Sequence, residues 1–304
     1  MIQFWELLSF NRPAKLTKLE VQDHESASVW LFSGAAVKIS IIIVHFFGED
    51  HLSKCLNSIP EHPSISELIV VDNGSKEGFA GRTRSTRKDV IVISNEKNIG
   101  YGAAVNKASG ISNGDVLLIL NQDIVFQKDT LVELINSIEQ NENTYIWGAT
   151  LQNMNGEEQG SAGPFPTLAN WIARLFKPRS QRKYYSTLPD PDSPVEWVTG
   201  AFLAIRRYCL DSMQGFDIDY FMYYEDVDLC KRAANKGFRT ALAKNVKATH
   251  SAPIAAKNNM DNPLAIEIRK SQLRYFLKHR PHWEYATLVW ITRFYFLLKG
   301  WKFH

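Results

Sequence analysis

The most constraining feature of this sequence is the run at positions 39–44, in which every residue except Ser40 is β-branched. A run without polar alternation is typical of a strand that is buried on both faces of a parallel sheet. Three more short apolar runs lie at 68–71, 90–93 and 116–120. Helical spacing of apolar residues occurs at 52–59, 100–108 and 130–138. Strands that alternate with helices predict an α/β fold, with a mostly parallel sheet and right-handed crossovers.

The second half of the chain has a more mixed pattern. Residues 152–194 are rich in proline and predict loops, and strand character returns at 195–205. A helix is expected at 225–235, followed by a short strand at 238–243. The end of the chain predicts helices with a break near Pro281.

Composition excludes several classes of protein. The chain has 304 residues, of which 45% are hydrophobic and 22% charged, so it can bury a large core and is neither disordered nor fibrous. The net charge of +3 is too small to indicate nucleic-acid binding, although residues 265–304 carry eight Lys or Arg against two Glu. Three widely spaced cysteines and a poor signal-peptide match at the start predict a cytoplasmic protein. No apolar run reaches the roughly twenty residues of a membrane span.

Polar clusters follow three of the expected strands. They are Asp72-Asn73-Gly74, the Asn-Ile-Gly-Tyr-Gly segment at 98–102, and Asn121-Gln122-Asp123. Ligands of open α/β sheets bind outside the carboxyl ends of the strands, so three such clusters favour a ligand site over ordinary turns. A carboxylate at Asp72 suits a ribose hydroxyl or a base N–H, and backbone N–H groups before the helix at 100–108 suit a phosphate. Asp123 suits a divalent metal.

Two further groups of residues suit catalysis. Glu225, Asp226 and Asp228 lie at the expected start of the helix at 225–235. Acids there either complement the helix dipole or, beside the aromatic residues that precede them, provide a general base. His250 is either a structural histidine or a metal ligand. Neither GxGxxG after the first strand nor GxxxxGK[ST] is present, which argues against hydride transfer and NTP hydrolysis.

The order of the motifs along the chain is informative. They are Ser40-Ile-Ile-Ile-Val44, Val-Val-Asp72-Asn-Gly-Ser75, Asn98-Ile-Gly-Tyr-Gly-Ala-Ala-Val-Asn106, Leu-Asn121-Gln-Asp123, Val198-Thr-Gly-Ala-Phe-Leu-Ala-Ile-Arg206, Gly215-Phe-Asp217, Glu225-Asp-Val-Asp-Leu-Cys-Lys-Arg232 and His250. This order resembles glycosyltransferase family 2, the inverting enzymes of the GT-A fold. The similarity runs from Lys38 to Ser251, and in particular it looks like the rhamnosyltransferase-like branch, which builds cell-surface polysaccharides.

The resemblance implies a donor site. Its expected residues are Asp72, Asn98, Gly100, Asn106, Asn121 and Asp123. Asp72 matches the acid that binds the nucleotide, and the segment from 98 to 106 matches the loop and helix beside the diphosphate. Asp123 matches the metal-binding acid of the DxD motif, whose first acid is Asn121 here, so metal binding is expected to be weak. The segment at 45–47 departs from the family's Thr-Tyr-Asn, so the pattern assigns this loop no donor contacts.

The resemblance also implies acceptor, catalytic and metal residues. Thr199 and Gly200 fall where family members shape the acceptor side. Asp226, with Glu225 beside it, matches the catalytic base. His250 matches the histidine that completes the metal site with the DxD acid, and the implied cofactor is Mg²⁺ or Mn²⁺.

The implied reaction is the inverting transfer of a sugar from a dTDP- or UDP-sugar to a saccharide acceptor. The preferred hypothesis is transfer of L-rhamnose from dTDP-rhamnose to a saccharide on a polyprenyl diphosphate, in the synthesis of O-antigen or exopolysaccharide. Transfer from a UDP-hexose or UDP-galactofuranose is the alternative within this fold. The alternative of another class is an inactive scaffold that binds nucleotide or glycan. A nucleotidyltransferase is disfavoured because no Gly-rich basic segment follows the first strand.

The expected organisation has three parts. Residues 1–36 form an N-terminal extension of unknown role, and residues 37–255 form the GT-A domain, with a donor half at 37–150 and an acceptor half at 151–255. Residues 256–304 form a basic, aromatic, helical tail. The tail predicts either contact with an anionic membrane surface or packing, on the catalytic domain or in a homodimer. A lipid-linked acceptor favours the membrane, which would place the protein on the inner face of the plasma membrane.

Overall fold

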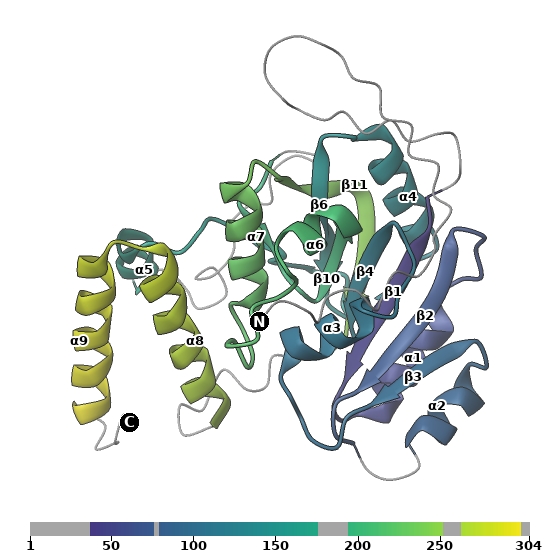
Figure 1. Ribbon diagram of the computed structural model, residues 1–304, viewed down its shortest axis with the longest axis horizontal. Coiled ribbons are helices and arrows are strands. Elements are labelled where there is room, and N and C mark those ends of the chain that lie inside the picture. Colours follow the sequence, from purple (N-terminus) through teal and green to yellow (C-terminus); the bar gives the residue numbers. More distant parts are fainter. Residues whose placement is uncertain (1–36, 76–78, 176–193, 252–262, 299–304) are drawn as a thin grey trace, which may run out of the picture. The chain divides into compact units, whose positions relative to one another are not determined.

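The β-branched run forms the central strand of a sheet. A computed structural model describes residues 37–75, 79–175, 194–251 and 263–298 (Figure 1). Strand β1 (Ile39–His45) is buried at every position except Val44. It pairs in parallel with β2 (Ile65–Asp72) on one side and with β4 (Val116–Asn121) on the other. Because neighbours cover both its edges and both its faces, β1 is apolar at almost every position.

The sheet continues on both sides of this parallel centre. The other main strands are β3 (Val90–Ser94), β5 (Ile124–Phe126), β6 (Thr144–Gln152), β7 (Glu158–Gln159), β10 (Phe202–Arg206) and β11 (Arg239–His250). Within the described residues the sheet has nine strands in the order β3-β2-β1-β4-β10-β6-β11-β5, with β7 paired to β6. β10 is antiparallel to β4 and β6, whereas β11 is parallel to β6. The carboxyl ends of β1, β2 and β4 therefore meet at one edge, as the sequence predicts.

Helices cover both faces of the sheet. On one face, Ile39, Ile41 and Ile43 of β1 pack with α1 (Glu49–Ser58), α2 (Phe79–Thr86) and α4 (Thr130–Gln140). On the other face, Ile42 packs with α3 (Tyr101–Ser109), α6 (Arg207–Ser212) and α7 (Glu225–Asn235). The predicted α/β class, with a mostly parallel sheet flanked by helices, is therefore correct.

Two parts of the sheet differ from the sequence pattern. β6 is central but is not predicted, because its residues lack clear alternation and include Gly148. A Cβ atom at Gly148 would lie 2.6 Å from the Cγ1 atom of Val198, so only glycine fits there. The strand expected at 195–205 is divided in two. β9 (Trp197–Val198) pairs with β8 (Ala162–Gly163), and the chain then turns before β10 enters the main sheet.

The C-terminal helices are α8 (Pro263–His279) and α9 (His282–Leu298), which are separated near Pro281 as predicted. Leu273, Tyr275 and Phe276 of α8 belong to the buried cluster that also contains α3 and α7. Of the two hypotheses for the tail, packing on the catalytic domain is therefore correct for α8. No helix of the described residues combines the length and apolar character that a membrane span requires.

The predicted extension at 1–36 lies outside the described residues. The division of the chain into a donor half, an acceptor half and a tail remains a prediction.

Candidate active site

Asp123 and His250, the predicted metal ligands, are neighbours. Asp123 follows β4, and His250 ends β11, where it pairs with Ile124 of β5. The Nε2 atom of His250 is 3.3 Å from the Oδ2 atom of Asp123, whose residue is 7% exposed. The Ser251 N–H donates to the Asp123 carbonyl oxygen at 2.9 Å. The pairing of β5 with β11 thus brings together two residues that are far apart in sequence.

Gln159 of β7 sets the orientation of the His250 ring. Its Nε2 atom donates to the His250 carbonyl oxygen at 3.2 Å, so its Oε1 atom faces Nδ1 of the ring at 3.0 Å. Nδ1 therefore carries the proton, and Nε2 points toward Asp123, as in metal-binding histidines. Burial acts to raise the pKa of Asp123, but the interaction with His250 outweighs burial, so the pKa is lowered.

The donor set of this pair fits a divalent cation that is shared with a phosphate. Within the described residues, no cluster of three or more His, Cys, Asp or Glu side chains suits a metal ion. Ions such as Mg²⁺ commonly use one or two carboxylates, substrate phosphates and water. One carboxylate and one oriented imidazole are therefore a sufficient protein contribution.

Asp226, the predicted base, lies in the first turn of α7 and is 5% exposed. Its Oδ2 atom accepts a hydrogen bond from the Gly200 N–H at 3.0 Å, and the Tyr101 hydroxyl donates to the Gly200 carbonyl oxygen at 2.7 Å. Burial, followed by the charges of Glu225, Asp226 and Asp123, raises the pKa of Tyr101. The carboxylates of the predicted base and of the predicted metal site therefore act on the same tyrosine.

The predicted acceptor residues form the turn between β9 and β10. The Thr199 N–H donates to the Ser161 carbonyl oxygen at 2.8 Å, and the Thr199 carbonyl oxygen accepts from the Phe202 N–H at 3.4 Å. Gly200 is buried and lies against Tyr101 and Asp226. The structure therefore brings Gly200 to the predicted base, while the backbone of Thr199 holds the turn.

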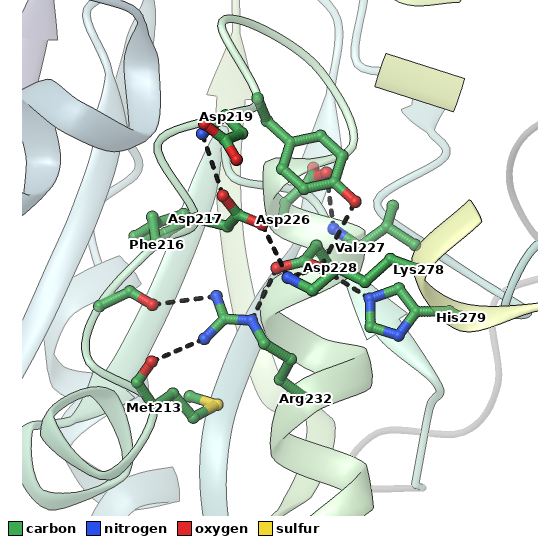
Figure 2. A network of polar contacts seen from close by, with 12 residues as sticks. Met213, Phe216, Asp217, Asp219, Asp226, Val227, Asp228, Arg232, Lys278 and His279 are labelled. Atoms are coloured by element: carbon green, nitrogen blue, oxygen red, sulfur yellow. Dashed lines mark hydrogen bonds and ion pairs between the residues drawn. The ribbon is translucent and has the colours of Figure 1, made fainter. Parts of the chain in front are cut away.

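Asp228 is the third acid of α7 and has a structural role (Figure 2). The residue is fully buried, and its carboxylate contacts Arg232 Nε at 2.7 Å, Lys278 Nζ at 2.8 Å and His279 Nε2 at 2.7 Å. Burial acts to raise the pKa of Asp228, but hydrogen bonds from His279, Lys278 and Arg232 hold it far below its usual range. Because Lys278 and His279 belong to α8, this contact joins α8 to the helix that carries Asp226.

Helix α8 also holds the segment that leads into α7. The Ser271 hydroxyl donates to the Met222 carbonyl oxygen at 2.8 Å. The ring centroids of Tyr275 and Tyr224 are 5.8 Å apart. Tyr223 and Tyr224 have φ angles of 67° and 68°, a left-handed backbone that costs energy in a non-glycine residue. Such strain persists where surrounding contacts enforce it, and it occurs often at functional sites.

The loop at 98–100 is held by its own hydrogen bonds. The buried Asn73 side chain donates to Asn98 Oδ1 at 2.9 Å and accepts from the Ile99 N–H at 3.1 Å. The Gly100 N–H donates to Asn98 Oδ1 at 2.9 Å, and a Cβ atom on Gly100 would lie 2.7 Å from the Phe221 carbonyl oxygen. Asn98 and Gly100 thus shape the loop, and a phosphate would have to displace these bonds to use the two N–H groups.

Helix α3 is also held by hydrogen bonds, which it makes with Phe216 and Phe221. The Tyr101 N–H donates to the Phe221 carbonyl oxygen at 3.0 Å. The Asn106 side chain donates to the carbonyl oxygen of Phe216 and accepts from its N–H, both at 2.8 Å. The amide nitrogen and the amide oxygen of Asn106 therefore both bond to the backbone of Phe216. The sequence, which predicts a donor-binding residue here, did not indicate this structural role.

Asp72 lies beside a histidine that the sequence did not single out. Asp72 ends β2, is 5% exposed and accepts from the Ser75 N–H at 2.8 Å. Its partner across the sheet is His45, whose ring stacks on Phe79 with the centroids 4.4 Å apart. Within the described residues, neither ring nitrogen of His45 has a hydrogen-bond partner.

Gln122, next to Asn121 at the end of β4, also has a buried polar atom without a partner among the described residues. Its Oε1 atom is buried and lacks a partner among the described residues, while its Nε2 atom donates to the Phe47 carbonyl oxygen. Burial lowers the pKa of His45, against the effects of Gln122, Asp72 and Glu49, so the ring is neutral. Buried polar atoms without partners are rare, and they are a signal for a ligand that only the structure provides.

The sequence was compared with known proteins. The family model described as Glycosyl transferase family 2 matches residues 40–198. The chain belongs to this family. It is a glycosyltransferase, and the resemblance noted in the sequence is confirmed.

Two relatives that align over most of the chain are named as rhamnosyltransferases. N-acetylglucosaminyl-diphospho-decaprenol L-rhamnosyltransferase of Mycobacterium tuberculosis is 24% identical over 276 residues, which cover 84% of this chain and 89% of that protein. Rhamnosyltransferase WbbL of Escherichia coli is 26% identical over 253 residues, which cover 80% of this chain and 94% of that protein.

Solved glycosyltransferase structures share the fold. The mannosyltransferase PcManGT from Pyrobaculum calidifontis, in complex with GDP-Man and Mn²⁺, superimposes with a TM-score of 0.54 at 15% identity over 81% of this chain and 64% of its own. GalNAc-T7 with UDP, GalNAc and Mn²⁺ gives a TM-score of 0.58 at 15% identity over 84% of this chain and 52% of its own. The chain thus spans less than two thirds of each, and at this identity the likeness shows the fold alone.

Asp228→Asn should destabilise the fold in a pH-dependent way. Folding lowers the pKa of this carboxyl, so it stabilises the protein above its unfolded pKa of about 3.9, and this contribution is lost as pH falls through the folded value. Removing one partner of a buried ionic cluster costs about 3–5 kcal/mol. Urea unfolding should therefore show a loss of this size at pH 7, and a smaller loss at pH 3. Asp211→Asn, at an exposed position on α6, is the control, and an equal loss at both pH values would contradict this account.

Proposed function

We propose that this glycosyltransferase transfers L-rhamnose from dTDP-rhamnose to a lipid-linked saccharide, with inversion at the anomeric carbon. The donor is supported by two relatives named as rhamnosyltransferases that align over most of the chain. A lipid-linked acceptor is supported by the name of the mycobacterial relative, which specifies N-acetylglucosaminyl-diphospho-decaprenol. The proposed setting is the synthesis of a cell-surface polysaccharide.

The observation that carries the proposed chemistry is a pair of buried carboxylates, Asp123 in contact with His250 and Asp226 held by the Gly200 N–H. Displacement of a nucleoside diphosphate requires charge stabilisation on the leaving side and a base on the attacking side. Asp123 and His250 supply the first, at the ends of β4 and β11. Asp226 supplies the second, at the start of α7.

Asp123 and His250 are the residues that would hold Mg²⁺ or Mn²⁺, with Gln159 fixing the ring. Such an ion neutralises negative charge on the diphosphate when it is bound. Two solved structures of the same fold contain Mn²⁺, which supports a divalent cation for this site.

Asp226 accepts the proton of the acceptor hydroxyl as its oxygen attacks the anomeric carbon of the donor. The bond between that carbon and the diphosphate oxygen breaks, and its electron pair leaves with the nucleoside diphosphate. The Gly200 N–H holds Oδ2 of the base in place at 3.0 Å. A single displacement of this kind inverts the anomeric configuration.

The nucleobase of the donor is proposed to lie against His45, Asp72 and Gln122. A neutral His45 ring offers one donor and one acceptor, and Gln122 Oε1 offers an acceptor. These atoms of His45 and Gln122 are buried and lack partners within the described residues. A pyrimidine edge carries complementary donors and acceptors.

A nucleotide panel tests donor and metal together. dTDP, UDP, GDP and CDP, each with and without Mn²⁺ or Mg²⁺, should give the largest thermal shift for dTDP with a divalent ion. A ligand at about one hundred times its dissociation constant stabilises by about 2.7 kcal/mol. In Asp123→Ala, the metal-dependent part of the thermal shift should be lost, and the shift caused by the nucleotide alone should remain. A preference for UDP would favour a UDP-sugar donor, and no response to any nucleotide would favour the inactive scaffold.

Asp226→Asn should abolish transfer without weakening donor binding. Loss of a general base reduces kcat by about 10²- to 10⁴-fold, whereas the dissociation constant of the nucleotide should stay unchanged because Asp226 lies on the acceptor side. Steady-state kinetics and nucleotide titration measure the two effects separately. Asp211→Asn is the matched control, and full transfer activity in Asp226→Asn would refute the proposed base.

His45→Phe should weaken nucleotide binding without lowering the stability of the protein. The new ring keeps the stack on Phe79 but removes two buried nitrogens that lack partners, so the melting temperature without ligand should hold or rise. Nucleotide affinity should fall about 5- to 150-fold, since a lost hydrogen bond in a buried site is worth about 1–3 kcal/mol. Calorimetric titration with dTDP measures this loss. An unchanged affinity would show that the nucleobase of the donor binds elsewhere.

A further inference from the structure

Helix α9 has one face that packs against the protein. Glu284, Leu288 and Thr292, spaced one turn apart, are buried. The Glu284 carboxylate accepts from the N–H of Leu168, in α5 (Leu168–Leu175), at 2.9 Å and pairs with Arg280 at 2.6 Å. These contacts fix the rotation of α9 about its own axis.

The opposite face of α9 is apolar and exposed. It consists of Trp283, Trp290, Phe294 and Leu297, which are 63%, 73%, 62% and 74% exposed. At 3.6 residues per turn, the four positions span an arc of about 60° and a length of about 21 Å. Single exposed apolar residues are normal, but four large ones in a row on a helix form a patch that requires a partner.

The charge around this patch is positive. Arg293, beside the patch on the helix, is exposed. The sequence adds Lys299 and Lys302 after the helix. Four other basic residues of the tail form ion pairs with acidic side chains instead, namely Lys270, Arg274, Lys278 and Arg280. Tryptophan and phenylalanine beside basic residues are the composition of helices that lie in an anionic lipid interface.

From this geometry we infer that the exposed face of α9, Trp283, Trp290, Phe294 and Leu297, binds the surface of an anionic lipid bilayer. The rings enter the boundary between headgroups and acyl chains, and the basic residues contact the lipid phosphates. The buried face of α9 stays on the protein, so the helix lies in the plane of the membrane.

A second copy of the chain fits this face less well than a lipid surface does. A stable protein interface uses about 20–30 residues on each side, far more than one helix stripe provides. Pairing two copies would also bring two positively charged tails together, whereas anionic lipid attracts both.

Co-sedimentation of the full chain with vesicles tests the inference. Vesicles of equal parts phosphatidylglycerol and phosphatidylcholine should bind the protein, and vesicles of phosphatidylcholine alone should bind at least about fivefold less. Raising the salt from about 0.1 M to 1 M should weaken binding, because the Debye length falls from about 10 to 3 Å.

Variants locate the contact. The double variant Trp290→Ser, Phe294→Ser should reduce binding to anionic vesicles at least tenfold while its melting temperature stays unchanged, since both side chains are exposed. Arg293→Glu should reduce binding severalfold. Met154→Ser removes an apolar side chain that is 70% exposed outside α9, and should bind as the unmodified protein does.

Three results would overturn the inference. The first is equal vesicle binding by the double variant and the unmodified protein, and the second is no binding to anionic vesicles at all. The third is a dimer in solution that the double variant dissociates, which would assign the face to a second copy. Vesicle binding is measured without nucleotide, and Asp226→Asn should bind vesicles normally, so the inference and the proposed reaction can fail independently.

Discussion

The buried carboxylate of Asp228 is the interaction on which the arrangement of the site depends. A fully buried charge is costly unless ionic partners surround it, and Arg232, Lys278 and His279 do so here. Arg232 also donates to the Met213 and Gly215 carbonyl oxygens. One carboxylate therefore joins α7, α8 and the loop before α7. Asp226 lies two residues away on the same helix, so the position of the proposed base follows from this cluster.

The proposed reaction needs two carboxylates from distant segments of the chain, Asp123 and Asp226, to face one substrate. The parallel half of the sheet supplies Asp72 and Asp123 by the usual rule of strand ends. The other half depends on strand order, because β11 runs beside β6 and then pairs with β5, which places His250 at Asp123. Gly148 permits this order by letting Val198 approach β6. The metal pair and the base are thus consequences of how β6, β9 and β11 pack.

The sequence predicts those parts of the site that depend on local pattern. Asp72 and Asp123 follow apolar runs, and Asp226 opens a clear helix, so their positions at strand and helix ends could be inferred. Contacts between distant segments could not be inferred, because no local pattern records them. His279 meets Asp228 across 51 residues, and Gln159 meets His250 across 91. β6 was missed for a related reason: it is central because its neighbours cover it, not because its own residues favour a strand strongly. Asn98 and Asn106 stay predictions as donor-binding residues, and in the structure their side chains hydrogen-bond to neighbouring backbone groups.

The buried polar groups of this molecule differ in how fully the protein satisfies them. Asp228 and Asn106 have all their strong interactions within the protein. At the sheet edge, His45 and Gln122 have buried polar atoms without partners in the described residues, and Tyr223 and Tyr224 hold a strained backbone before α7. Each of these features costs stability without a ligand. Buried atoms without partners also occur elsewhere in the described residues, at Trp147, Thr240 and Tyr275. What distinguishes His45 and Gln122 is their place at the strand ends beside Asp72 and Asp123, where the proposed donor lies.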